Sequence, residues 1–206
     1  MINIVKLIAL FFLCFISECA LCQKMYVWTP IDISVAERSG FLDDEHIDLV
    51  VFDARTLTKN SKIECSSEEL LSTIVQLVKK SIPSAKINIL SSDNYYKASR
   101  DSVITLKISI YAYHAAFGSE VKVAIGAIGG EFSSMVFPEG KWNAITGYDV
   151  AVFDHRSERK KLSKKICKIH SKSNMMGYKT AKKALNSTFI EANQEMFSFF
   201  EKCFLE

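Results

Sequence analysis

The sequence predicts an α+β fold, a two-layer arrangement in which two helices pack on one face of a mainly antiparallel sheet. Of the 206 residues, 49% are hydrophobic and 24% are charged, as in folded globular proteins. The middle of the chain alternates apolar and polar residues with the period of a strand, and two other segments have a helical period. Three prolines and eight glycines leave little room for a linker, so residues 23–206 are expected to form one domain.

Residues 1–22 have the composition of a secretory signal peptide. Lys6 precedes the uncharged run Leu7–Ile16, which is shorter than the roughly 20 residues that a membrane-spanning helix needs. Ala20-Leu21-Cys22 then resembles a cleavage site, and the exported chain after it is expected to have no membrane span. Two alternatives stay open: lipidation of Cys22, although the residue before it does not suit a lipoprotein signal, and an uncleaved anchor.

The first buried strand and the first helix follow from local patterns. Residues 47–52 form a continuous apolar run, typical of a strand buried on both faces, and parallel pairing of this strand stays open. Ser66 and Glu69 match a capping box, and the helix that follows is expected to end near Pro83. Upstream, residues 25–35 are weakly extended and indicate an edge or irregular strand.

Five further segments are predicted as strands: residues 86–90, 102–116, 120–128, 142–153 and 161–169. The last two are expected to pair as a hairpin. In the second segment one face is apolar, and the other face carries Thr105, Lys107, Ser109, Tyr111 and Tyr113. Glycines mark a bend in the third segment, at Gly126, Gly129 and Gly130. Residues 178–204 have apolar positions at helical spacing and predict a long C-terminal helix.

Positive charge is concentrated near the C-terminal end, although the whole chain has a net charge of only +3. Residues 156–183 contain eleven basic residues and a single acidic one, Glu158. The basic residues are Arg156, Arg159, Lys160, Lys161, Lys164, Lys165, Lys168, Lys172, Lys179, Lys182 and Lys183. This basic hairpin and helix start would suit an anionic lipid or glycan, or an acidic protein face. The alternative is a solvated hairpin and an exposed helix face, since lysine is a common solubilising residue of edge strands. The helix dipole disfavours cations in the first helical turn, and a bound anion would relieve that cost.

Other candidate sites are weaker. Tyr111 and Tyr113 would suit base stacking, but no arginine-rich groove accompanies them, so nucleic acid is not an expected partner. His155 and His170 would approach each other only if the hairpin pairs, and no third metal ligand is evident. Motifs of hydrolases and of nucleotide-binding loops are absent, so no catalytic residue, metal or cofactor is expected.

Two further features are predicted to be structural. Cys65, Cys167 and Cys203 remain after cleavage; they allow at most one disulfide, and at least two are expected to act as small buried hydrophobes. Asp53-Ala54-Arg55 and Asp154-His155-Arg156 each end an apolar strand with an acid and a base on one face. This spacing predicts local ion pairs at the surface of the sheet ends.

The order of the elements also carries information. An exported start is followed by the strand IDLVVFDAR, a capped helix, the strands SVITLKISIYAY, EVKVAIGAIGG and WNAITGYDVAVFDHR, and a long terminal helix. In this order the chain resembles small envelope proteins of Gram-negative bacteria with a compact α/β fold, among them periplasmic lipoproteins and transport-auxiliary or lipopolysaccharide-assembly components. The resemblance implies a non-enzymatic accessory or binding role. The chain departs from the lipoprotein members because it lacks their lipidation signal.

The sequence therefore predicts an exported, non-enzymatic protein of the periplasm or the medium that contacts a protein partner or an anionic envelope component through residues 156–183. Two alternatives remain. One is an exported hydrolase built around His155 or His170. The other is a structural subunit that oligomerises through the phenylalanines of the terminal helix, Phe197, Phe199, Phe200 and Phe204. The ligand and the oligomeric state stay open.

Overall fold

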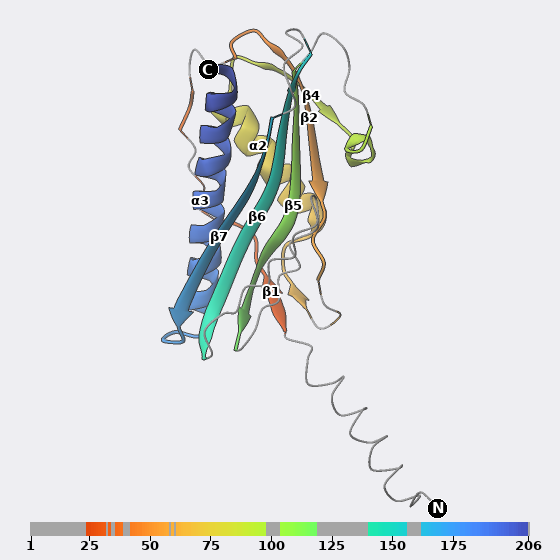
Figure 1. Cartoon of the computed structure of the whole chain (residues 1–206). Helices are drawn as coiled ribbons and strands as arrows, with labels where there is room; N and C mark the ends of the chain where they lie inside the picture. The colour runs from red at the N-terminus through yellow and green to blue at the C-terminus, as the bar shows by residue number, and fades with distance from the viewer. Residues whose placement is uncertain are drawn as a thin grey trace, which may run out of the picture.

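The computed structural model describes residues 24–31, 33, 36–38, 42–57, 59, 61–97, 104–118, 140–155 and 162–205. Within these residues a curled seven-stranded sheet is joined by two helices and a short 3-10 turn (Figure 1). The elements are β1 (Met25–Val27), β2 (His46–Asp53), β3 (Lys62–Ile63), α2 (Ser67–Ser81), β4 (Lys86–Leu90), η1 (Ser92–Asn94), β5 (Ile104–Phe117), β6 (Lys141–Asp154), β7 (Leu162–Ser173) and α3 (Tyr178–Leu205). The predicted signal, residues 1–22, and the predicted strand at 120–128 with its glycines lie outside the described residues.

The long strands β5 and β6 form the centre of the sheet and pair antiparallel along their whole length. β7 pairs antiparallel with the other edge of β6, which confirms the predicted hairpin. The free edge of β5 is shared by two strands, because β2 pairs with residues 104–110 and β1 pairs with Ala115 and Ala116. β4 then adds to β2, and β3 adds to β1.

The sheet is mixed, so the prediction of a mainly antiparallel sheet is wrong. β2 runs parallel to both of its neighbours, β4 and β5. The chain passes from β2 through α2 to β4, and a helical crossover of this kind lets neighbouring strands point in the same direction. The middle of β2 is buried residue after residue, which is the pattern of a parallel strand covered on both faces.

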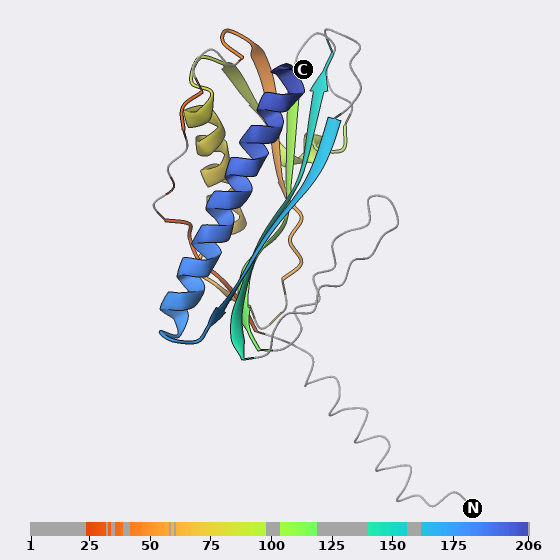
Figure 2. The ribbon, with the colours of Figure 1, turned by 60° about the vertical axis from the view of Figure 1, so that its left-hand side comes forward.

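Both helices lie on the same side of the sheet (Figure 2), and their buried residues join one hydrophobic core with it. The capping box of α2 forms as predicted: the Glu69 amide donates to Ser66 Oγ (3.1 Å), and the Ser66 amide donates to Glu69 Oε2 (2.7 Å). α3 occupies almost the residues predicted for it. Its Phe197 and Phe200 are buried in this core, so they are not available as contacts to a second copy.

A β-bulge changes which side chains of β5 share a face. The register with β6 shifts between Ile110 and Ala112, and the alternation reverses beyond that point. Tyr113 therefore lies under α3, with its ring centre 5.3 Å from that of Phe189. Tyr111 lies on the opposite face, where its hydroxyl donates to the carbonyl of Ile166 (2.8 Å). The prediction that Tyr111 and Tyr113 share the polar face is wrong, because the bulge adds one residue.

Gly147 in β6 lies directly against the Tyr111 ring, and this close contact can be tested. A Cβ at this position would lie 2.3 Å from Cε2 of the Tyr111 ring. We expect Gly147→Ala to lower the free energy of unfolding by about 1–3 kcal/mol, because the ring cannot move aside without losing its hydrogen bond. In a Tyr111→Ala background the same substitution should cost much less, and urea unfolding of the four proteins measures the difference. Equal costs in both backgrounds would contradict this role of the ring.

Candidate functional site

The structure divides the predicted basic segment into sets with different surroundings. Arg156, Arg159, Lys160 and Lys161 lie outside the described residues. Lys164, Lys168 and Lys182 form ion pairs with carboxylates. Lys165 lies on the sheet face away from α3, with its Nζ 5.2 Å from the centre of the Tyr111 ring. Lys172, Lys179 and Lys183 are exposed around the turn between β7 and α3.

The paired lysines each contact a carboxylate on another part of the fold. Lys164 and Lys168 lie on the α3 side of β7 and both contact the Glu195 carboxylate, at 2.7 and 2.6 Å. Hydrogen bonds from Lys164 and then Lys168 lower the pKa of Glu195, so its charge persists over the neutral range. Lys182 contacts Glu64 at 3.3 Å and lies 5.4 Å above the Trp28 ring. Lys164 and Lys168 share one carboxylate, and Glu64 also contacts Lys62 (3.5 Å), so these ion pairs link α3 to β7 and to the end of β3 but offset only part of the positive charge.

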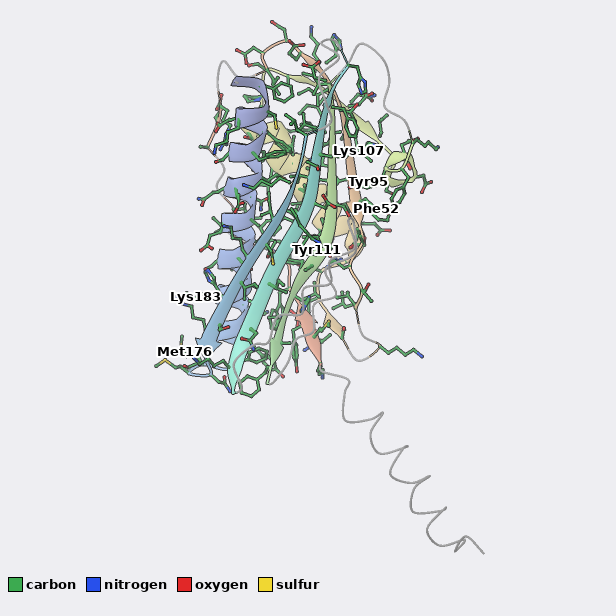
Figure 3. The ribbon with its side chains drawn as sticks, in the orientation of Figure 1. Phe52, Tyr95, Lys107, Tyr111, Met176 and Lys183 are labelled. Atoms are coloured by element: carbon green, nitrogen blue, oxygen red, sulfur yellow. The ribbon has the colours of Figure 1, made fainter. Side chains whose placement is uncertain are left out.

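The remaining cations surround an exposed apolar turn, and we call this set the tip surface: Lys172, Met175, Met176, Tyr178, Lys179 and Lys183. Met175 is 87% exposed and Met176 is 61% exposed. Figure 3 shows Met176 and Lys183 at this end of the molecule. Among the described residues no carboxylate pairs with the three lysines of the tip surface. The first turn of α3 also contains no acidic residue.

A rigid support lies beneath the tip surface. The rings of Tyr26, Trp28, Trp142 and Tyr178 contact one another, with centroid distances between 5.1 and 6.1 Å. The indole N–H of Trp142 donates to Asn174 Oδ1 (3.0 Å) in the turn itself. The Met175 amide donates to the Ser173 carbonyl (2.9 Å). The turn is therefore fixed by the core, and its methionines are held in solvent by a defined backbone.

A pocket of about 310 Å³ lies beside the tip surface, between the start of α3 and the segment that follows β1. Its lining includes Trp28, Thr29, Ile31, Glu64, Lys182 and Asn186. Glu64 and Lys182 pair with each other at this pocket, and the side-chain Oδ1 of Asn186 accepts a hydrogen bond from the Ile31 amide (2.9 Å). Its polar groups are thus engaged within the protein, and the pocket presents no unpaired charge to a ligand.

The histidines of the sequence analysis are not brought together. β6 ends at Asp154, next to His155, whereas His170 pairs with Ala144 near the other end of β6. Ten residues of strand separate those positions, roughly 30 Å at the usual rise. His170 contacts Glu191 (3.0 Å), and no described hydroxyl or thiol hydrogen-bonds to its ring. No group of three described His, Cys, Asp or Glu side chains could hold a metal ion.

The three cysteines in the described part of the chain are unbonded, and two of them are buried as expected: Cys65 and Cys203 lie in the core, and Cys167 is partly covered. The Asp53–Arg55 ion pair forms as predicted, but its exposure differs from the prediction. The Arg55 side chain is only 3% exposed and that of Asp53 is 15% exposed. The segment after β2 lies beside β5, because the Ala54 amide donates to the Ile110 carbonyl (2.9 Å), and Arg55 is covered there.

The sequence analysis did not single out His114, which is the most strongly buried histidine of the described chain. His114 is 5% exposed on β5, and its Nε2 has no hydrogen-bond partner among the described residues. Burial, with a smaller contribution from the Arg55 charge, lowers the pKa of His114 to about 4.

Comparisons with known proteins find neither a matching family model nor a matching curated sequence. Among solved structures, a DUF330-family protein from Xanthomonas campestris is 9% identical, with a TM-score of 0.46 over 84% of this chain and 92% of that one. A homolog of neuraminyllactose-binding hemagglutinin from Helicobacter pylori is 7% identical, with a TM-score of 0.43 over 86% and 98%. The PelC dodecamer of Paraburkholderia phytofirmans has a TM-score of 0.34 at 9% identity, over 76% and 93%. Identities and scores this low assign neither a family nor a function to the chain.

Neither of the described helices is both long enough and apolar enough to span a membrane.

Proposed function

We propose that this chain is an exported, non-enzymatic binding protein of the cell envelope that contacts an anionic partner through the tip surface. The observation that carries the proposal is the set of three exposed lysines, Lys172, Lys179 and Lys183, which pair with no described carboxylate. Elsewhere in the same segment, lysines on α3 or facing it have carboxylate partners within 4 Å. The unpaired lysines therefore remain available to an external anion.

The position of these lysines favours an anion over simple solvation. Lys179 and Lys183 lie in the first turns of α3, where the helix dipole already contributes positive potential. Cations at that place raise the free energy of the isolated protein slightly, and an anion bound there would remove the cost.

Charge reversal tests the proposal. We expect the triple variant Lys172→Glu, Lys179→Glu, Lys183→Glu to bind immobilised heparin, a soluble polyanion, at least about tenfold more weakly at low salt. The matched control reverses three exposed lysines elsewhere, Lys59, Lys79 and Lys80, and changes the net charge by the same amount. The control should retain most of the binding. If both variants lose binding equally, net charge rather than the tip surface governs it, and the proposal is wrong.

A further inference from the structure

The two methionines of the tip surface are not explained by anion binding alone. Met175 and Met176 are large apolar side chains that stand in solvent at the end of a turn fixed by hydrogen bonds. The turn needs Gly177, whose φ of +56° lies in the left-handed region, to bring the chain from β7 into α3. Because hydrogen bonds fix the backbone of this turn, the exposure of the two methionines is part of the folded structure.

The chemistry of the tip surface is that of a membrane interface. Apolar side chains at the apex would enter the region between lipid headgroups and acyl chains, and lysines set back from the apex would reach anionic phosphates. Tyr178, half exposed beside them, has the amphipathic ring that favours the headgroup level. A soluble glycan or polyphosphate would engage the lysines but leave both methionines in water.

The first described strand, β1, lies at the end of the molecule that carries the tip surface, as contact of this end with a membrane would allow. β1 lies at the same end of the molecule as the β7–α3 turn (Figure 1), and the Tyr26 and Tyr178 hydroxyls lie 3.2 Å apart. Lys24, exposed just before β1, lies 5.5 Å from the centre of the Tyr26 ring and adds a cation to this end.

We propose that the partner is the anionic surface of a lipid bilayer, which the tip surface contacts with Met175 and Met176 inserted among the headgroups. This inference rests on the proposed function and names the class of its partner. Three lysines near an anionic bilayer together strengthen binding by roughly 100-fold, so the contact should depend strongly on lipid charge and on salt.

A fluorescent tryptophan in the turn between β7 and α3 of the full chain tests whether this turn enters a bilayer. Met176→Trp is mixed with phosphatidylglycerol vesicles, and we expect its emission to move to shorter wavelength and to be quenched by brominated acyl chains. The native Trp28 and Trp142 are buried, and the unsubstituted protein measured in parallel supplies their background. The control is Tyr96→Trp, at a position that is 81% exposed and contacts Phe52, away from Met176 in Figure 3. It should show neither change.

The lysine variant separates the two proposals. Adding Lys172→Glu, Lys179→Glu and Lys183→Glu to Met176→Trp should weaken vesicle binding at least roughly 100-fold, because it removes three attractive charges and adds three repulsive ones. If Met176→Trp responds equally to neutral phosphatidylcholine vesicles, the requirement for an anionic lipid is wrong. If it does not respond to phosphatidylglycerol while heparin binding still depends on the three lysines, the lipid inference fails and the anionic-partner proposal stands. If heparin binding is also independent of the lysines, both fail.

Discussion

Replacing Arg55 with alanine is expected to lower the free energy of unfolding by about 3–5 kcal/mol, which is the cost of leaving a buried charge without its partner. Nε and Nη2 of Arg55 donate to the two carboxylate oxygens of Asp53 at 2.8 and 2.7 Å, and the Arg55 amide donates to Asp53 Oδ1 (3.0 Å). The pair is shielded from water, because the Arg55 side chain is only 3% exposed. Removing the guanidinium would leave the Asp53 carboxylate in that poorly solvated place.

Urea unfolding at pH 7 measures this effect against an exposed ion pair. Lys86 and Asp44 are 3.8 Å apart and 57% and 90% exposed, so Lys86→Ala should cost no more than about 1 kcal/mol. The double variant Asp53→Asn, Arg55→Met should be more stable than Arg55→Ala, because neither charge is then left alone. If Arg55→Ala costs no more than Lys86→Ala, the buried pair does not stabilise the fold.

The same pair has a pH dependence with a definite sign. Burial raises the pKa of Asp53, but hydrogen bonds from Arg55 and Ser67 outweigh it and hold the pKa below its ordinary value. A carboxylate with a depressed pKa contributes stability above about pH 4, and that contribution is lost as the pH falls through the lower folded pKa. Protonation of Asp53 would therefore weaken the junction of β2 and β5 only in acid.

Local signals in the sequence predicted most of the elements correctly. Ser66 and Glu69 cap α2 through bonds between residues three apart, so the signal and the structure lie in the same short segment. The hairpin of β6 and β7 and the long helix α3 follow from the period of their apolar residues. Each of these depends on contacts that the neighbouring sequence determines.

The features that could not be predicted depend on residues distant in the chain. The parallel pairing of β2 with β5 joins residues more than 50 positions apart, and the apolar run that left parallel pairing open could not show which strand β2 would pair with. One extra residue at Tyr111 moved Tyr113 to the covered face, and alternation alone cannot show such a bulge. Glu195 on α3 contacts both Lys164 and Lys168 on β7, and no local pattern shows that a carboxylate so distant in the chain lies beside these two lysines.

The burial of His114 has an expected consequence, which is a loss of stability in mild acid. His114 has a folded pKa of about 4, whereas the unfolded chain takes up the proton near pH 6.5. Because only the unfolded state is protonated between these values, the full contribution is present above pH 6.5 and declines as the pH falls toward 4. The difference in pKa corresponds to about 3 kcal/mol over that window.

His114→Leu removes the titrating group and fills its place with an apolar side chain of similar size. The free energy of unfolding of this variant should therefore fall much less between pH 7 and pH 4.5 than that of the unsubstituted protein. Urea unfolding of both proteins at several pH values gives the two curves, and carboxylates such as Asp53 affect them alike. The two curves should converge or cross as the pH is lowered. Parallel curves would mean that His114 takes up its proton at the same pH in the folded and unfolded states, which would require an anionic partner for a ring whose Nε2 has none among the described residues. The proton-linked slope therefore tests the burial of β5 independently of any binding measurement.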